Sequence, residues 1–546
     1  MGPRLKNLLY AAWLAAIVAF AVLHGLNLRA DFPNHTAWYG DWAKYTDEGW
    51  YSNAAIRAHL LGHWYLKGDF NPAVALPVWP FLEWIEFFLT GVSLEAARGL
   101  AIAGFFLNLL LSYLLLRTSG SRWMALLALT LMVTSPFLYC FSRLANLEPF
   151  LMVFTLAALN LAVRLPRLRK PVWGAFAVGV LFAVMMLTKT NALFLLPALA
   201  WAIALPLRGC RRLAMQCFLA AGAAFAAGYG LWLALIASRG FLVDYKLLFF
   251  INKYPRPHEF YWPLVAFWWS FHGGLWADQV LIPLAGIVVL TAFIAALLAR
   301  RRPASPVSQS LAAFARRLLL DPVFSASVIA GAGTIAFMTW QDHPQPRYFT
   351  VTAVFCFILA AQGAAALLEQ ASRSAGTLRL LLNGAGVTVV AVSLLAAAAN
   401  GAQTLTYVTH PEYTFVKAAE RLTQYIDTHP NGRRLLVSVS GDQIMLATHL
   451  AAICDDYGTM PLTEKLSEFQ PGWYASWNDL DPATLEDLHT RYSLEQVAAY
   501  SAFDDSDRNL LVLFKLQPLP GGKVRDEVGE NLRIKLPDDK FDVDVE

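Results

Sequence analysis

The chain has 546 residues, of which 57% are hydrophobic and only 15% are charged, and its mean hydropathy is +0.46. This composition excludes a water-soluble protein of this length and indicates a membrane protein with many spans. The net charge of +4 is unevenly divided, because residues 405–546 contain 13 basic and 24 acidic residues. We therefore expect a basic transmembrane domain over residues 1–404 and an acidic soluble domain over residues 405–546.

Apolar runs of about twenty residues predict eleven transmembrane helices. These runs are 7–28, 97–116, 123–141, 148–164, 172–187, 190–207, 213–236, 279–299, 322–340, 348–368 and 379–400. The first run is long and lacks a convincing small-residue cleavage site, so we expect an uncleaved span rather than a signal peptide. Basic residues in the short loops predict a cytoplasmic N-terminus. An odd number of spans then places the C-terminal domain outside the plasma (inner) membrane, in the periplasm or its equivalent.

The first predicted loop, residues 29–96, contains two candidate amphipathic helices. One begins near Trp50, and the other covers residues 77–91. In the first helix, one stripe at helical spacing is apolar and the opposite stripe is polar. The apolar stripe is Trp50, Ala54, Ala58, Leu61 and Tyr65, and the polar stripe is Ser52, His59, His63 and Lys67. This pattern is typical of helices that lie on a membrane surface.

Two adjacent carboxylates, Asp47 and Glu48, stand in the segment "WAKYTDEGWYSNAA" just before that helix. Acidic groups at a membrane border are costly and are kept there mainly for function. A carboxylate beside apolar rings has a pKa that is biased upward, which suits a general base. The structural alternative is a helix N-terminus, with Thr46 or Asp47 as the cap and Glu48 in the first turn. Both roles are compatible, because a capping turn would also hold the base in place.

Basic residues at the outer ends of spans suggest a phosphate site. Lys189 lies in the tight turn "TKT", Arg347 opens the tenth span, and Arg143 lies near Glu148 in "FSRLANLEPFL". The alternative for each single cation is snorkelling to lipid headgroups. Three cations at one depth beside an acidic pair favour phosphate binding, because Arg offers a forked donor and Lys a point charge. The predicted substrate cavity comprises Tyr51, Glu148, His343 and Tyr348.

The sequence gives little support for a metal or another cofactor. Five cysteines show no paired spacing, which argues against a disulfide framework or a metal cluster. His59 and His63 have the spacing of two ligands on one helix face, but no third ligand stands at a suitable distance along the sequence. We therefore expect no cofactor and no metal, and nothing suggests a nucleic-acid partner.

Four segments together resemble the C-type superfamily of membrane glycosyltransferases. They are "TDEGWY" followed by "GDFNPAVALPVWPFLEW", then "RLANLEPFLMVFTLAALNL", "GVLFAVMMLTKTNALFLLPALA" and "HPQPRYFTVTAVFCFILA". They look most like the branch of protein O-mannosyltransferases and the lipid A aminoarabinose transferase. The resemblance covers roughly residues 1–400. It implies a polyprenyl-phosphate-linked sugar donor, used outside the membrane with inversion at the anomeric carbon.

The resemblance also implies roles for single residues. Asp47 falls on the catalytic acid position of the first loop, and Lys189 and Arg347 match positions that face the donor phosphate. The stretch before Asp47 also holds Asp31 and Asp41, so either is an alternative base. The expected acceptor is a hydroxyl of a glycolipid, a glycan or a protein.

Chemistry independent of the family agrees with this function. A lipid phosphate leaves as a stable anion with a second pKa of about 6, so no strong general acid is needed. The alternative function is a transporter or flippase of lipids or lipid-linked sugars. That reading predicts charges near mid-span and two related halves, whereas the notable charges stand at the ends of spans.

The C-terminal domain is expected to be a small α/β unit. Helices are predicted over 414–427 and 481–492, and strands over 433–440 and 508–516. The last twenty or so residues alternate between polar and apolar types and are rich in charge, which fits either a terminal hairpin or a loose end.

Overall fold

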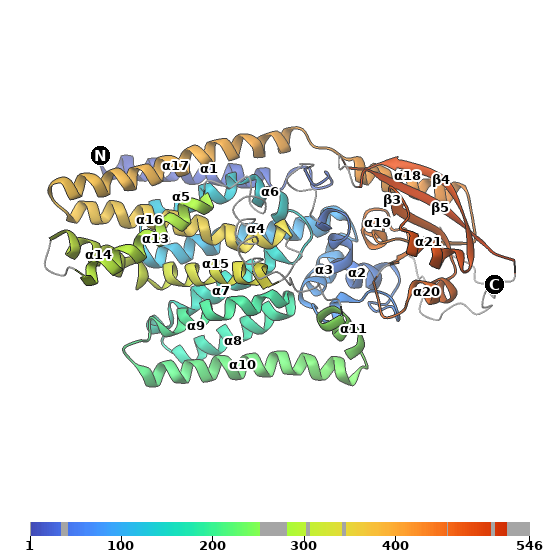
Figure 1. Cartoon of the computed structure of the whole chain (residues 1–546), viewed down its shortest axis with the longest axis horizontal. Helices are drawn as coiled ribbons and strands as arrows, with labels where there is room; N and C mark the ends of the chain where they lie inside the picture. The colour runs from blue at the N-terminus through green and yellow to red at the C-terminus, as the bar shows by residue number, and fades with distance from the viewer. Residues whose placement is uncertain are drawn as a thin grey trace.

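The computed structural model describes residues 2–33, 42–251, 281–301, 306–340, 345–455, 457–503 and 508–520. A long bundle of helices occupies one end of the molecule, and a region built around a β-sheet occupies the other (Figure 1). The helices of the bundle are α1 (Pro3–Leu23), α4 (Leu94–Ser119), α5 (Arg122–Thr134), α6 (Pro136–Ser142), α7 (Glu148–Ala162), α8 (Pro171–Thr188), α9 (Leu196–Ala204), α10 (Arg211–Ser238), α13 (Leu281–Arg301), α14 (Pro306–Leu319), α15 (Pro322–Trp340), α16 (Thr350–Arg373) and α17 (Gly376–Thr409).

The bundle is that of a polytopic membrane protein. Among the described residues, seven helices are long and apolar enough to cross a membrane, or nine if each of two bent pairs forms one span. Two further apolar helices, Glu148–Ala162 and Thr190–Ala204, are shorter. Each of the eleven predicted runs coincides with one of these helices or pairs, while the count of eleven spans stays a prediction.

The predicted span 123–141 is broken rather than straight. Helices α5 and α6 meet at an angle of 68°, because Pro136 has no N–H to continue the helix and clashes with the preceding turn. The Ser135 side chain then accepts a hydrogen bond from the Leu138 N–H and caps the new helix. The second bent pair, α14 and α15, breaks in the same way before Pro322, where Asp321 caps α15.

Two helices of the first loop lie between the bundle and the sheet region: α2 (Asp47–Leu60) and α3 (Val78–Thr90). Both were predicted as surface helices, but α2 is buried around most of its circumference. The polar stripe does not mark the exposed face of α2. Ser52 donates a hydrogen bond to the buried Glu83, and α19 of the C-terminal region covers another face of α2. Helix α3 does keep an exposed apolar face, which includes Phe81, Trp84, Phe88 and Leu89.

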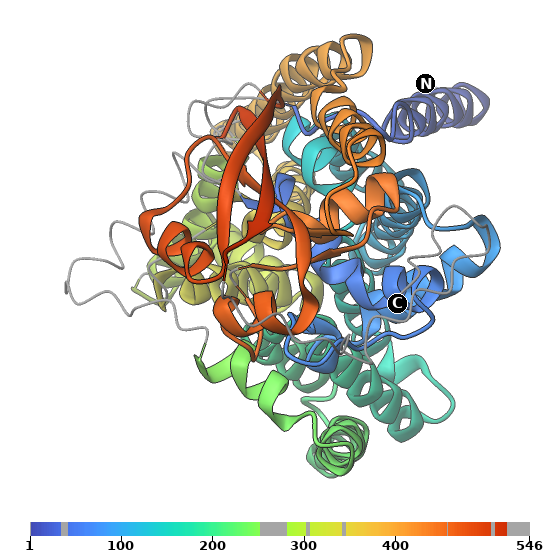
Figure 2. The same cartoon turned by 90° about the vertical axis from the view of Figure 1, so that its right-hand side faces the viewer.

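The C-terminal region is a mixed α/β structure. Its elements are α18 (Thr414–Thr428), β1 (Arg433–Val437), α19 (Gly441–Thr448), β2 (Ala452–Ile453), α20 (Leu462–Phe469), β3 (Pro471–Trp477), α21 (Pro482–His489), β4 (Tyr492–Ser501) and β5 (Leu510–Pro518). The strand order is β2-β1-β3-β5-β4, with β1 parallel to β2 and β3, and β5 antiparallel to β3 and β4. Figure 2 shows this sheet in front of the helix bundle.

The predicted elements of this region are present, and α19, β2, α20, β3 and β4 were not predicted. The predicted terminal hairpin or loose end lies outside the described residues. One apolar core joins side chains of the first loop, such as Ile56 and Trp79, to side chains of the sheet region, such as Leu446 and Trp473. The C-terminal region is therefore packed directly onto the first loop, and the division at residue 404 stays a prediction.

Candidate active site

Asp47 and Arg347 form a buried ion pair at the junction between the bundle and the first loop. The Asp47 Oδ2 atom lies 3.0 Å from the Arg347 Nε atom, and the two side chains are 3% and 6% exposed. Asp47 is the first residue of α2, and Arg347 stands in the short turn Pro346–Phe349 that leads into α16. The fold therefore brings the predicted acid to one of the predicted phosphate-binding cations.

A second buried ion pair, between Lys189 and Glu148, lies in the same cluster. Lys189 follows the last residue of α8, and Glu148 opens α7. The ring of Tyr348 connects the two pairs, because its centroid is 4.4 Å from the Lys189 Nζ atom and 4.9 Å from the Arg347 Cζ atom. Two cations thus flank one aromatic ring, an arrangement that stabilises positive charge away from water.

Tyr51 faces this cluster from the next turn of α2. Burial raises the pKa of its phenol well above the ordinary value, and the negative charge of Asp47 adds to the effect. Tyr51 is therefore neutral at physiological pH and its hydroxyl can donate a hydrogen bond. Of the seven residues predicted for the phosphate site and the substrate cavity, six lie in the described part of the chain, and His343 lies outside it.

Glu48 points away from Asp47 and is held by the protein itself. Its carboxylate accepts hydrogen bonds from Arg98 Nε and Nη2 at 2.7 and 2.6 Å, from the Ala145 N–H at 2.9 Å and from Gln443 Nε2 at 2.9 Å. Burial alone would raise the pKa of Glu48, but the Arg98 guanidinium and these hydrogen bonds hold it below the ordinary value. These contacts make Glu48 a poor proton acceptor, because the ionised form is already stabilised.

Arg143 makes contacts with other groups than those that Lys189 and Arg347 contact. Its guanidinium donates to the Tyr139 hydroxyl and to the backbone carbonyls of Leu26 and Asn27. It therefore ties the end of α6 to the chain that follows α1. These contacts indicate a structural role for Arg143. Lys189 and Arg347, in contrast, lie beside the same Tyr348 ring.

The alternative acid Asp31 anchors the C-terminal region. It accepts hydrogen bonds from the Thr414 N–H and hydroxyl, both at 2.6 Å, and from the Phe415 N–H at 3.1 Å. These donors belong to the first turn of α18, so Asp31 acts as a cap supplied from outside the helix. Asp41, the other alternative acid, lies outside the described residues.

Sequence reasoning did not find Arg98 or Gln443. Arg98 lies in α4 within a predicted apolar span, and a lone buried cation in such a run is a signal that it has an acidic partner. Gln443 lies in a segment for which no helix was predicted. No pattern in the sequence indicated that it would reach Glu48.

A buried charge network joins α2 to the C-terminal region. Arg57 Nη2 lies 2.6 Å from Asp69 Oδ2 and 3.1 Å from Asp442 Oδ1, and Lys465 Nζ lies 3.0 Å from Asp69 Oδ1. All four side chains are fully buried. Removing one partner of such a network leaves an uncompensated buried charge, so the network fixes α19 against α2.

The described residues contain no group of three or more His, Cys, Asp or Glu that could hold a metal ion. His59 and His63, the pair considered from the sequence, contact the backbone carbonyls of Trp84 and Leu61.

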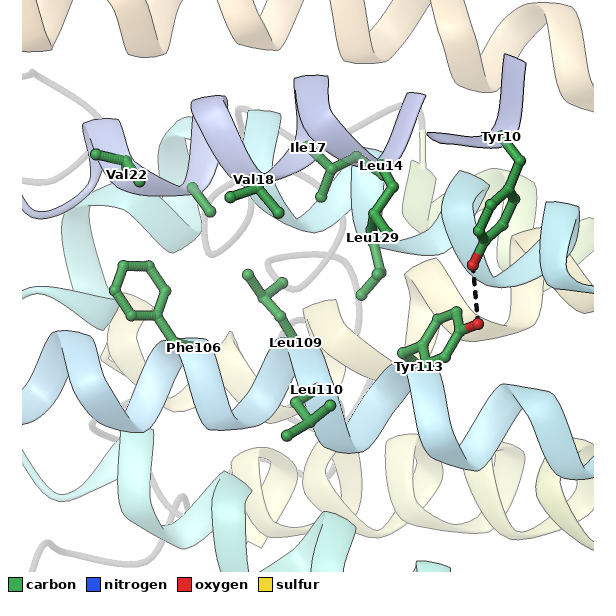
Figure 3. Close-up of a pocket in the computed structure, with 11 residues that line it drawn as sticks. Tyr10, Leu14, Ile17, Val18, Val22, Phe106, Leu109, Leu110, Tyr113 and Leu129 are labelled. Atoms are coloured by element: carbon green, nitrogen blue, oxygen red, sulfur yellow. Dashed lines mark hydrogen bonds between the residues drawn. The ribbon is translucent and has the colours of Figure 1, made fainter. Parts of the chain in front are cut away.

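The described part of the bundle contains apolar cavities, two of which lie between helices. The larger, about 440 Å³, lies between α1, α4 and α5, and a hydrogen bond of 2.8 Å between the hydroxyls of Tyr10 and Tyr113 closes one end (Figure 3). The smaller, about 280 Å³, is lined by α8, α9 and α10 and includes Leu193, which follows Lys189 by one turn. Both cavities have the lining expected around a hydrocarbon chain.

Comparison with known proteins gives a family match over part of the chain and a similarity of fold over most of it. Residues 72–236 match the family model of the dolichyl-phosphate-mannose-protein mannosyltransferases. The fold is similar to ArnT from Cupriavidus metallidurans bound to undecaprenyl phosphate, with a TM-score of 0.57 and 14% identity over 92% of this chain and 98% of that chain. The apo form of ArnT gives a TM-score of 0.56 and 15% identity over the same shares.

The archaeal oligosaccharyltransferase AglB from Archaeoglobus fulgidus, in complex with an inhibitory peptide and a dolichol-phosphate, has a TM-score of 0.48 and 11% identity over 85% of this chain and 69% of that chain. No curated protein sequence matches this chain. The family match confirms the resemblance to membrane glycosyltransferases that was predicted from the sequence.

Proposed function

We propose that this membrane glycosyltransferase, whose residues 72–236 carry the mannosyltransferase family match, moves a sugar from a polyprenyl phosphate to an acceptor hydroxyl with inversion. One observation carries the proposal. Asp47 lies in a buried contact with Arg347, and Lys189 lies beside the same tyrosine ring as Arg347. An acid that can take a proton and two cations that can hold a phosphate thus share one site.

Asp47 is the general base in this proposal. Attack on the anomeric carbon requires that the acceptor hydroxyl lose its proton, and a positioned base contributes a factor of about 10²–10⁴ to the rate. In this structure Asp47 contacts Arg347. When the donor phosphate binds Arg347, it replaces that contact and leaves the Asp47 carboxylate to accept the proton of the acceptor.

Arg347 and Lys189 hold the departing phosphate. The bond that breaks joins the anomeric carbon to the phosphate oxygen, and the electron pair leaves with the lipid phosphate. That product is stable as an anion, with a second pKa of about 6, so cations serve it better than a general acid. The planar guanidinium of Arg347 can donate two parallel hydrogen bonds to the phosphate oxygens, and the ammonium of Lys189 supplies a compact positive charge.

Glu148, Tyr51 and Tyr348 line the sugar cavity. Within the described part of the chain, the buried Oε2 atom of Glu148 has no hydrogen-bond partner, so it can accept a hydrogen bond from a sugar hydroxyl. The neutral Tyr51 hydroxyl can donate one. Glu48 and Arg143 position the surrounding backbone through the contacts described above and do not meet the substrate in this proposal.

The proposed membrane setting follows the distribution of charge. In this proposal the chain has the eleven spans predicted from the sequence, with the N-terminus in the cytoplasm and residues 405–546 outside the plasma membrane. The N-terminus lies at the end of the bundle away from the sheet region (Figure 1). In this proposal the start of α2, with Asp47 and its contact to Arg347, lies toward the outer side. The lipid chain of the donor occupies an apolar space such as the cavity between α8, α9 and α10, which begins one turn after Lys189.

The test offers the purified protein a panel of polyprenyl-phosphate sugars and measures the release of free polyprenyl phosphate. The wild type should consume at least one donor. Asp47→Asn should insert normally and bind that donor at least as tightly as the wild type, because no carboxylate competes with the phosphate for Arg347, but it should lose about 10²–10⁴ in kcat. The control is Asp427→Asn, because Asp427 is exposed on α18 and its salt bridge with Arg434 is distant from the site. Normal turnover by Asp47→Asn would remove Asp47 as the base.

A further inference from the structure

A glutamine of the C-terminal region contacts the first turn of α2, which begins with the proposed base. Gln443 Oε1 accepts a hydrogen bond of 2.7 Å from the Gly49 N–H, and Gln443 Nε2 donates one of 2.9 Å to Glu48 Oε2. The Gln443 side chain is buried, with only 1% of the residue exposed. One amide group therefore holds both the backbone and the side chain of the two residues that follow Asp47.

Helices α2 and α19 meet here as closely as their backbones allow. A Cβ atom added to Gly49 would lie 2.1 Å from the Gln443 backbone nitrogen, so only glycine fits at this position of α2. The contact is also fixed on both sides. Trp50 Nε1 donates to the Val439 carbonyl at 2.9 Å, and Asn53 Nδ2 donates to Asp442 Oδ2 at 3.0 Å.

Glu48 is held from three separate elements. Arg98 comes from α4, the Ala145 N–H comes from the segment between α6 and α7, and Gln443 comes from α19. Of these three, Gln443 alone also binds the backbone of α2, through Gly49. It is therefore placed to fix the rotation of the first turn of α2, and with it the direction of the Asp47 side chain.

We propose that Gln443 is a positioning residue for sugar transfer, through which the C-terminal region sets the orientation of the base. This inference rests on the proposed function, because it takes Asp47 as the base. Lys189 follows α8 and Arg347 precedes α16, whereas Gln443 binds the first turn of α2. Loss of Gln443 should therefore act on the chemical step and leave donor binding in place.

The expected loss of rate follows from how strongly catalysis depends on the position of the base. A misplacement of about 1 Å can cost about 10²-fold in rate, and the buried N–H of Gly49 would lose its partner. Gln443→Ala should lower kcat about 10- to 100-fold and change the donor KM by no more than about twofold. Gln443→Met, which keeps the volume without the hydrogen bonds, should do the same and guards against a cavity effect. The matched control is Gln424→Ala, because Gln424 is an exposed glutamine on α18.

Gln443→Glu gives a signature that a purely structural role would not show. The new carboxyl can still accept from Gly49, but when ionised it faces the Glu48 carboxylate and donates nothing to it. The charged groups around it are Glu48 with Arg98 on one side and Asp442 with Arg57 on the other. Protonation restores the donor, so the kcat of this variant relative to wild type should rise as the pH falls. Gln443→Met should show no such rise.

Hydrogen exchange supplies a readout that does not depend on activity. Peptides that cover α2 should exchange faster in Gln443→Ala than in wild type or in Gln424→Ala, because the Gly49 N–H is released. Unchanged kcat and unchanged exchange in Gln443→Ala would overturn the inference, as would a failure of both Gln443→Ala and Gln443→Met to fold. If the wild type transfers no sugar while exchange in α2 still responds to Gln443, the proposed function fails and the structural coupling stands.

Discussion

The Oδ2 atom of Asp47 lies 3.0 Å from the Nε atom of Arg347, so the start of α2 and the turn before α16 meet through opposite charges. In the proposed reaction the phosphate of the donor competes with Asp47 for this guanidinium. The ion pair therefore links donor binding to the release of the base. It also separates two measurable effects, because Arg347 acts on binding and Asp47 on the chemical step.

Replacement of Arg347 should weaken donor binding. A hydrogen bond to a charged group contributes about 1.5–3 kcal/mol, so Arg347→Ala should raise the Kd for a polyprenyl phosphate about 10- to 100-fold. Arg347→Lys keeps the charge but loses the fork and should give an intermediate value. Binding is measured by titration of the purified protein with undecaprenyl phosphate. Arg239→Ala is the control, because Arg239 is exposed at the end of α10. Equal affinity in Arg347→Ala and Arg239→Ala would contradict the phosphate site.

Removal of Arg98 should be a stability defect. Glu48 and Arg98 are almost fully buried, with side chains 1% and 6% exposed, and loss of one partner of a buried pair costs about 3–5 kcal/mol. Arg98→Ala should therefore lower the thermal midpoint strongly. Arg29→Ala breaks only exposed salt bridges to Glu95 and Glu420 and should cost less than about 1 kcal/mol. If Arg98→Ala lowered the thermal midpoint as little as Arg29→Ala, the ion pair between Glu48 and Arg98 would not stabilise the fold.

The sequence predicted those features of the structure that depend on neighbouring residues alone. Apolar runs located the helices of the bundle, because a span needs about twenty apolar residues whatever surrounds it. The end-of-span position of Lys189 and Arg347 marked both as candidates for one site, and the structure brings them to the same tyrosine ring.

Long-range partners were not predictable in this way. The contacts of Glu48 could not be read from the sequence, because Arg98, Ala145 and Gln443 are 50, 97 and 395 residues away along the chain. Helix α2 looked like a surface helix because nothing in its own sequence shows that α19 covers it. Tertiary burial, rather than local pattern, decides both cases.

The pH dependence of stability should report the buried Asp442. Burial raises its pKa to about 6, against the pull of the nearby Arg57, while Asp69 lies close with the same charge and Lys465 with the opposite one. A carboxyl with a raised pKa binds a proton more tightly in the folded state. Its contribution is therefore fully present below the ordinary pKa near 3.8 and is lost as the pH rises through about 6.

The comparison is between wild type and Asp442→Asn, which cannot titrate. The stability of the wild type relative to this variant should fall between pH 4 and pH 6.5, with the change centred in the window set by the two pKa values of about 3.8 and 6. Thermal midpoints across this range measure it. Parallel curves for the two proteins would show that Asp442 keeps the same charge throughout the range.

Substitution of Asp31 and of Asp47 should differ in the effect on turnover. Asp31 caps α18 through Thr414 and Phe415, and loss of a cap costs about 0.5–2 kcal/mol. Asp31→Asn should therefore lower the thermal midpoint and keep most of the turnover, because an asparagine oxygen can still accept from these donors but carries no charge. Asp47→Asn should lose turnover. It also leaves the buried Arg347 without its charged partner, so its thermal midpoint should fall as well. Turnover and thermal midpoints are measured on the same preparations of Asp31→Asn and Asp47→Asn. If Asp31→Asn abolished transfer while Asp47→Asn retained it, the base would be Asp31, and the contact between Asp47 and Arg347 would be an ordinary structural ion pair.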